Sequence, residues 1–264
     1  MRRNNHLPYE WILGPIIWCI EYISDEMVMA GLMTESIIAF EYQPILLKVA
    51  RDKLLRSNKK KTLVGINKLI KWAAGQADWA RKQKMSDFAD INRHSIVSIW
   101  GALEACIEDT IVLILINDHH RCYKLLLESG ISIKESYENG ITESQARKIY
   151  KAIERKIRER YNAGEGFVNI LKIFEIEVVI NCQILLILDE INEVRNCILH
   201  NSGRINEKAA KKIPALEKHI YSEFIIDRKK CSEYFDSIRL FLSAIFKGIS
   251  KSEYLFPKLE DENI

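Results

Sequence analysis

The chain has 264 residues, of which 48% are hydrophobic and 28% are charged, and its net charge at pH 7 is +3. This composition is that of an ordinary globular protein, with enough apolar side chains for one large core or two modest ones. So small a net charge excludes a histone-like polycation, and 11 Gly with 5 Pro exclude collagen-like and Pro/Gly-rich disordered chains.

Residues 1–84 are expected to form an N-terminal helical region of unknown role. The region contains an apolar stretch, residues 11–20, which is too short to span a bilayer and includes Gly14 and Pro15. Polar and acidic residues follow this stretch instead of the small residues of a signal-peptide cleavage site. Six cysteines without a Cys-x-x-Cys pair predict reduced, buried thiols. A cytoplasmic protein without a membrane partner is therefore predicted.

Apolar residues recur at helical spacing in most long segments, which predicts an all-α fold, a multi-helix bundle. Helices are expected over residues 62–84, 87–117, 142–161, 167–174, 178–201 and 228–249. Thr142 and Gln145 predict a capping box at the start of the third of these helices. Residues 223–226 could be extended, but no set of alternating strands is present to build a sheet around them. The main helical domain is expected over residues 85–250, with a frayed tail over 251–264.

The segment 192–203 carries the most informative chemistry of the chain. An α-helix turns by about 100° per residue. On the helix expected over residues 178–201, four apolar residues therefore share the face that should point to the core, namely Ile184, Leu188, Ile191 and Ile198. Arg195 falls near the middle of this face. Burying an unpaired guanidinium is costly, so Arg195 needs an anionic partner, with Glu104 and Glu108 as candidates, or an opening to solvent or to another subunit.

His200 follows Arg195 by five positions, near a helix end indicated by Asn201 and Gly203. Asn196 precedes His200 by four positions, so its amide is placed to orient the imidazole. Imidazole exchanges protons near neutral pH, and a guanidinium binds phosphate oxygens. These are suitable groups for phosphodiester chemistry without a metal.

The run Arg195-Asn196-x-x-x-His200 resembles the Arg-x4–6-His signature of HEPN domains, including the polar residue directly after the arginine. The surrounding residues, 193–203, are similar to bacterial HEPN proteins of toxin and phage-defence systems. The resemblance extends to residues 93–104 and to the apolar helix after Arg228, and it covers about residues 85–250 in all.

The HEPN resemblance implies an all-α domain that pairs with a second copy to form a composite cleft. Many members of the family are metal-independent endoribonucleases, in which an RNA 2′-OH attacks the adjacent phosphorus and leaves a 2′,3′-cyclic phosphate. Carried onto this chain, Arg195 would bind the scissile phosphate and His200 would transfer protons. Asn196 would position His200 or contact phosphate. Supporting roles are expected for Glu193 and Asn201, and Glu104 is the candidate partner that holds Arg195.

The expected partners are therefore RNA, a second copy of the chain, and an antitoxin or sensor protein. No cofactor and no metal are expected, because Asp118, His119 and His120 lack further ligands at a supporting spacing. The basic segment 145–160 has two interpretations, a solvated helix face or an electrostatic track for RNA in which Arg155 and Arg158 take part.

Two alternatives to the ribonuclease stay open at this point. The first is a non-catalytic HEPN-like module that recognises a nucleotide, RNA or a partner protein through Arg195 and His200. The second is a helical scaffold in which Arg195 forms an internal ion pair.

Overall fold

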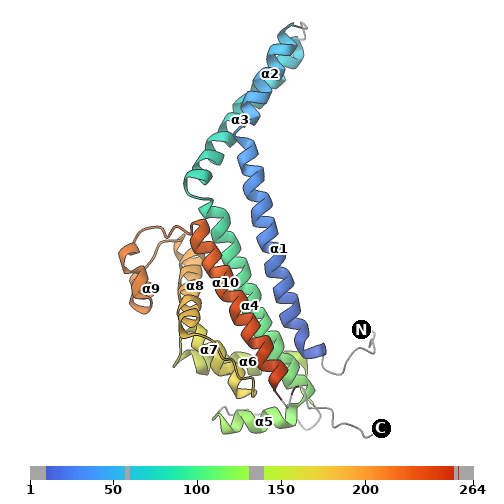
Figure 1. Cartoon of the computed structure of the whole chain (residues 1–264), viewed down its shortest axis with the longest axis vertical. Helices are drawn as coiled ribbons and strands as arrows, with labels where there is room; N and C mark the ends of the chain where they lie inside the picture. The colour runs from blue at the N-terminus through green and yellow to red at the C-terminus, as the bar shows by residue number, and fades with distance from the viewer. Residues whose placement is uncertain (1–9, 57–59, 131–139, 253–254, 256–264) are drawn as a thin grey trace.

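The computed structural model describes residues 10–56, 60–130, 140–252 and 255. The described chain is all-α, as the hydrophobic periodicity predicts (Figure 1). Its elements are α1 (Glu10–Phe40), α2 (Gln43–Arg56), α3 (Lys60–Met85), α4 (Ala89–Asn117), α5 (His119–Glu128), α6 (Glu143–Arg158), α7 (Ala163–Ile173), α8 (Cys182–Asn201), α9 (Glu207–Lys212), the 3₁₀ helix η1 (Pro214–His219) and α10 (Arg228–Lys251).

The predicted helices correspond to α3, α4, α6, α7, α8 and α10, with shifted ends. The capping box is confirmed, because the Thr142 side chain accepts from the Gln145 backbone N–H and the Gln145 side chain accepts from the Thr142 N–H. The helix expected from residue 178 begins only at Cys182, where the Asn181 side chain caps it. Gly14 and Pro15 do not break α1, which runs through both residues.

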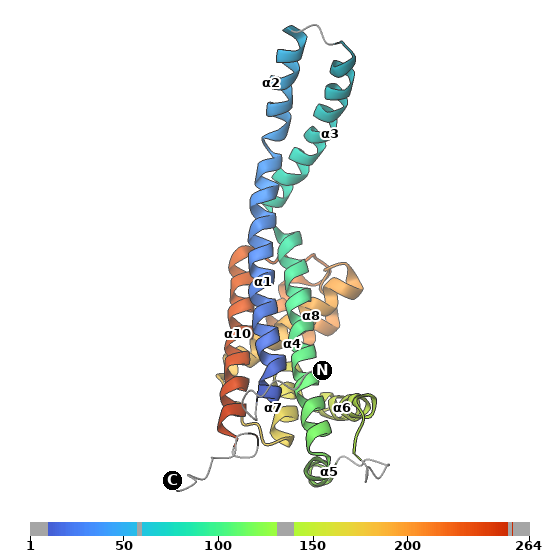
Figure 2. The same ribbon diagram turned by 90° about the vertical axis from the view of Figure 1, so that its right-hand side faces the viewer.

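The core is built around α4, which packs against α1, α6, α8 and α10. Trp100 and Leu103 of α4 are fully buried, and the Trp100 ring contacts the ring of Phe167 from α7. Phe167 in turn contacts Phe241 of α10. Figure 2 shows α1 and α4 running side by side, with α8 on the other side of the bundle. α4 therefore fixes the relative positions of α1 and α8.

The N-terminal region divides into a packed part and a projecting part. Ile12, Ile16, Cys19 and Ile23 of α1 are buried in the same core as α4 and α10. By contrast, α2 has no buried residue, and α2 and α3 form an antiparallel pair that projects beyond the rest of the molecule (Figures 1 and 2). The boundary expected at residue 84 lies at the end of α3, although α1 packs as part of the bundle.

Residues 202–227 connect α8 to α10 through the short helices α9 and η1 and irregular segments. Arg204 and Glu223 form an isolated antiparallel bridge, and Ile205 bridges to Ile220, so no sheet forms in the described chain. Of the tail expected over residues 251–264, Lys251 is the last residue of α10, and Ser252 and Leu255 are also described. The other residues of the expected tail lie outside the described part of the chain.

All six cysteines are free thiols, and five of them are buried as predicted. Cys182 is exposed at the start of α8, which corrects the expectation that all are buried. Among the described helices, none combines the length and the apolarity that a membrane span requires.

Candidate functional site

The site predicted from the sequence lies on the C-terminal half of α8. The helix ends at Ser202, which adopts a left-handed conformation with φ 52°, and Gly203 follows with φ 78°. The Gly203 backbone N–H donates to the Cys197 carbonyl oxygen at 3.0 Å. This helix end places Arg195, Asn196 and His200 in the last two turns of α8.

Arg195 is held by two neighbours and stays partly open to solvent. Its Nη2 donates to Glu104 Oε2 of α4 at 3.2 Å, and its Nη1 donates to Asn196 Oδ1 at 3.1 Å. The Arg195 side chain is 23% exposed, while its Nε is buried without a hydrogen-bond partner. The predicted pairing with Glu104 is present, and the guanidinium is not sealed inside the core.

Glu104 links Arg195 to a second arginine. Its other carboxylate oxygen, Oε1, lies 3.3 Å from Arg158 Nη2 at the end of α6, and Arg158 also pairs with Glu154 at 2.8 Å. One carboxylate therefore joins α4, α6 and α8 at a single point. Glu108, the other candidate for Arg195, instead pairs with Arg147 and Lys151.

The core face of α8 is rotated relative to the predicted one. Leu188 and Ile191 are fully buried, but Ile184 and Ile198 are only half-buried. The other apolar members of the buried face are Ile187, Val194 and Cys197. Arg195 therefore lies at the margin of the apolar face rather than in its middle, which lets the head group reach both Glu104 and solvent.

Three polar residues of α8 are buried, namely Asp189, Asn192 and Glu193. They line a small pocket of about 140 Å³ together with Arg158 of α6 and Lys212 of α9. Glu193 forms an ion pair with Lys212, while Asn192 Oδ1 is buried without a hydrogen-bond partner. Glu193 is therefore occupied with α9 and does not contact Arg195.

Asp189 joins α8 to the start of α7. Its Oδ1 accepts from the Gly164 backbone N–H at 2.8 Å. A Cβ at Gly164 would lie 2.7 Å from the Leu185 carbonyl oxygen, so only glycine allows this close approach. Burial raises the pKa of the Asp189 carboxyl above its ordinary value.

His200 is exposed on the last turn of α8, and Asn201 is half-buried beside it. Five positions on a helix correspond to about 140° of rotation and about 7.5 Å of rise. Arg195 and His200 of one chain therefore point in different directions. Asn196 is hydrogen-bonded to Arg195, whereas none of the hydrogen bonds of the described residues joins Asn196 to His200. The predicted orientation of His200 by Asn196 is absent from this structure.

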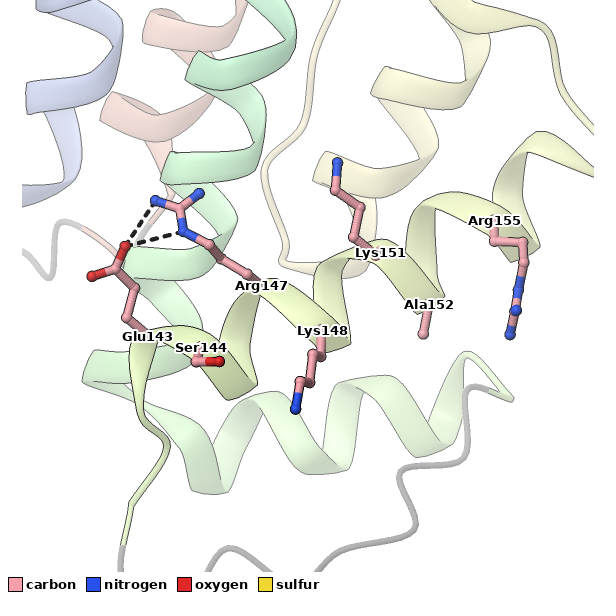
Figure 3. Close-up of a pocket in the computed structure, with 7 residues that line it drawn as sticks. All are labelled: Glu143, Ser144, Arg147, Lys148, Lys151, Ala152 and Arg155. Carbon is pink, nitrogen blue, oxygen red and sulfur yellow. Dashed lines mark hydrogen bonds and ion pairs between the residues drawn. The ribbon is translucent and has the colours of Figure 1, made fainter.

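The basic face of α6 is divided between paired and unpaired cations. Arg147 pairs with Glu108, Asp109 and Glu143, and Lys151 pairs with Glu108 and Glu154. Figure 3 shows Arg147 and Lys151 pointing toward α4, while Lys148 and Arg155 point to the opposite side of α6. All four line one open depression. Within the described chain, Lys148 and Arg155 take part in none of the ion pairs, so they are the cations available to an anionic ligand.

The sequence gives no signal for two members of the polar pocket. Lys212 belongs to α9, which has six residues and is too short to show a helical period. Asp189 is polar at a position that is buried only because α7 packs over it.

In the described residues, no cluster of three or more His, Cys, Asp and Glu side chains could hold a metal ion. Comparison of the chain with protein-family models, with curated proteins and with solved structures gives no match.

Proposed function

We propose that the protein is a metal-independent endoribonuclease whose reaction depends on Arg195 and His200 of α8. The observation that carries the proposal is the state of Arg195. Its guanidinium is fixed by Glu104 and Asn196, and yet the side chain remains 23% exposed, on the helix that also presents an exposed His200. A guanidinium held in this way can bind a phosphate without losing much conformational freedom.

The proposed reaction is the transfer of a phosphodiester from the 5′ to the 2′ oxygen of RNA. The 2′-OH loses its proton to a base and forms a bond to phosphorus, while the bond to the 5′ oxygen breaks and that oxygen takes up a proton. The products are a 2′,3′-cyclic phosphate and a 5′-OH. Arg195 would stabilise the charge on the phosphate oxygens, and His200 would transfer a proton.

A second copy of the chain would complete this site. Arg195 and His200 diverge by about 140° around α8, so Arg195 of one copy would act on the phosphate with His200 of the other. The symmetry of a two-fold dimer would then create two equal sites. Arg155 and Lys148 on α6 supply positive charge for the RNA, and Arg158 shares Glu104 with Arg195. A toxin or phage-defence role in the cytoplasm, restrained by an antitoxin or sensor, would fit such an activity.

The ion pair between Arg195 and Glu104 favours a second candidate function, that of a binding domain without catalytic activity. Because Glu104 already pairs with Arg195, Arg195 and His200 could bind a nucleotide, an RNA or a partner protein without cleaving anything. In that case His200 would contribute to binding only.

The two candidates are separated by incubating the purified full-length chain with a labelled single-stranded RNA in EDTA. The ribonuclease predicts cleavage by the wild type, and loss of cleavage in His200→Ala. His94→Ala is the matched control, because His94 is exposed on a different helix. The non-catalytic module predicts RNA binding with no cleavage above that of His200→Ala. RNA cleaved equally by all three proteins would reject His200 as a catalytic residue.

A further inference from the structure

The segment that contains the projecting helices α2 and α3 is strongly basic (Figures 1 and 2). Residues 43–85 have twelve Lys and Arg against two acids, Asp52 and Asp78, and so carry a net charge of +10. The whole chain has a net charge of only +3, so the remaining residues have a net charge of −7. Asp52 pairs with the adjacent Arg51, and Asp78 pairs with Arg81. An anionic ligand is therefore attracted to this segment more than to the rest of the chain.

One face of α3 combines lysine and tryptophan side chains. An α-helix turns by about 100° per residue, which places six positions of α3 within an arc of about 100°. These positions, which we call the Lys–Trp face, are Lys68, Lys71, Trp72, Gly75, Trp79 and Lys82. The buried apolar residues of α3 centre about 160° away around the helix, at Ile66, Ala73, Ala77 and Ala80. The Lys–Trp face is therefore opposite the packed side of α3.

The side chains of the Lys–Trp face are open to solvent. Trp72 is 58% exposed and Trp79 is 42% exposed, and the three lysines are also exposed. Among the ion pairs of the described residues, none involves a lysine of this face. The two tryptophans are seven residues apart, or about 10 Å along the helix axis. Between them, a Cβ at Gly75 would meet nothing within 4 Å, so open space separates the two rings.

We infer that the Lys–Trp face of α3 binds single-stranded nucleic acid. The lysine ammonium groups would bind phosphates, and unpaired bases would stack on the rings of Trp72 and Trp79. The bases of a duplex are already stacked on one another, so they are not available to these rings. Because every base has a flat face, binding of this kind tolerates many sequences.

The mixture of lysine and tryptophan on one face favours nucleic acid over a membrane or a protein partner. A helix that lies on a membrane separates its apolar side from its cationic side, whereas α3 presents both kinds of side chain within one arc. Protein interfaces are depleted in lysine, yet lysine occupies three of the six positions of the Lys–Trp face. A nucleic-acid strand offers phosphates to the lysines and bases to the rings along its whole length.

The Lys–Trp face is separate from the proposed ribonuclease site, because it belongs to the projecting helices and Arg195 belongs to the bundle (Figure 1). The C-terminal end of α8, which carries His200, nonetheless lies toward the end of the bundle from which α2 and α3 project (Figure 1). There a Cβ at Gly203 would lie 3.2 Å from Nη1 of Arg93, near the start of α4. Binding to α3 requires no cleavage, so it can hold whether or not the protein is a ribonuclease.

The test measures the binding of labelled oligonucleotides to the full-length chain by fluorescence anisotropy. A 2′-O-methyl oligouridylate has no free 2′-OH, so the proposed ribonuclease reaction cannot cleave it. The wild type should bind this probe and oligo-dT with similar affinity, because base stacking and phosphate contacts do not involve the 2′-OH. A duplex of oligo-dT with oligo-dA should bind more weakly.

Substitution of the two tryptophans tests base stacking. Trp72→Leu with Trp79→Leu should weaken binding about a hundredfold, or about tenfold for each stacked base that is lost. Trp72→Phe with Trp79→Phe keeps two aromatic rings and should retain most of the affinity. Trp18→Leu is the matched control and should bind like the wild type, because Trp18 is 49% exposed on α1, which has five Asp and Glu and neither Lys nor Arg.

Substitution of the three lysines tests the phosphate contacts. Lys68→Ala with Lys71→Ala and Lys82→Ala should lower the slope of log K against log salt by about 2, since each phosphate contact to a single strand contributes about 0.7. The matched control replaces three exposed lysines of α10 by alanine and should leave the slope unchanged. These control lysines are Lys229, Lys247 and Lys251.

Four outcomes would overturn the inference, with circular dichroism showing unchanged helix content in each variant. The first is a wild type that binds neither oligonucleotide, including one that instead sediments with phosphatidylserine vesicles. The second is a duplex that binds as tightly as the single strands. The third is a leucine variant that binds as tightly as the phenylalanine variant, and the fourth is a salt slope that the α3 and α10 lysine substitutions change equally. A wild type that binds these probes but cleaves no RNA would reject the proposed function alone.

Discussion

Glu104 Oε2 and Arg195 Nη2 lie 3.2 Å apart and join the central helix α4 to α8. The other oxygen of the same carboxylate contacts Arg158, so Glu104 pairs with two arginines from two further helices. An arginine at the margin of an apolar face is thereby held in one orientation. This contact is the structural basis of every functional prediction made for Arg195.

The Glu104–Arg195 pair should be measurable as a coupling between two substitutions. Removing Glu104 leaves the half-buried guanidinium without its counter-ion, whereas removing both partners removes that penalty. In a double-mutant cycle with Glu104→Ala and Arg195→Ala, we expect a coupling energy of about 1 kcal/mol, reduced from buried-pair values because both side chains are partly exposed. Urea unfolding provides the free energies.

The matched control for this cycle is the Asp236–Arg239 pair on α10, whose side chains are 60% and 61% exposed. This pair should show a smaller coupling, because solvent screens it. Equal coupling in both pairs would mean that the burial of Arg195 adds nothing to its interaction with Glu104.

A composite site predicts complementation between two inactive proteins. If Arg195 of one copy acts with His200 of another, a mixture of Arg195→Ala and His200→Ala chains contains heterodimers with one intact site. Mixing the two proteins after brief partial denaturation, which allows the chains to exchange, should therefore restore part of the cleavage of labelled RNA. Each protein treated alone should stay inactive. If the mixture cleaves no more RNA than either protein alone, Arg195 and His200 do not act together across two chains.

The unpaired cations of α6 should contribute to RNA affinity more than the paired ones do. Lys148→Ala with Arg155→Ala should weaken RNA binding and lower the slope of log K against log salt by about 1 for each residue. Arg147→Ala with Lys151→Ala breaks ion pairs to Glu108 and should mainly lower the free energy of unfolding. Fluorescence anisotropy at several salt concentrations measures the slopes. An unchanged slope in the first variant would leave α6 as a solvated face.

Asp189 should make the protein less stable as pH rises. Its carboxyl has a pKa raised by burial, so the folded state holds the proton more tightly than the unfolded state does. The free energy of unfolding falls as pH rises from the pKa of Asp189 in the unfolded chain, near 3.8, through its higher pKa in the folded protein. Above the folded pKa, the free energy lost in this way stays constant. Asp189→Asn removes the charge and keeps an acceptor for the Gly164 N–H.

The gain in stability of Asp189→Asn should therefore be near zero at the lowest pH and grow toward neutral pH. Thermal unfolding of both proteins between acidic and neutral pH gives this difference. A gain that is largest in acid would contradict the assigned direction of the pKa shift.

The sequence predicts most of the long helices because their stabilisation is local or periodic. The capping box at Thr142 and Gln145 and the apolar rows of α3 and α4 are examples, since the spacing of neighbouring residues determines them. The contact of Arg195 with Glu104 was also predictable, because a guanidinium beside an apolar face needs an acid.

The rest of the site depends on contacts between distant parts of the chain. The burial of Asp189 and Glu193 follows from Gly164 of α7 and Lys212 of α9, which no spacing within α8 reveals. The rotation of the α8 core face has the same origin, because α4, α7 and α10 pack against α8, and Ile187 and Val194 are buried. Such contacts require the tertiary fold and cannot be obtained from helical periodicity.

The most direct measurement for the proposed function is the chemistry of the RNA ends. Fragments made by the wild-type chain in EDTA should carry 2′,3′-cyclic phosphates, seen as a mass about 18 Da (one water) below that of the corresponding phosphomonoester, because the 2′-OH and not water attacks the phosphorus. The Arg195→Ala and His200→Ala chains, folded as judged by circular dichroism, should yield no such fragments. Intact RNA with the wild type, or the same cyclic ends with His200→Ala, would contradict the assignment of these two residues to catalysis.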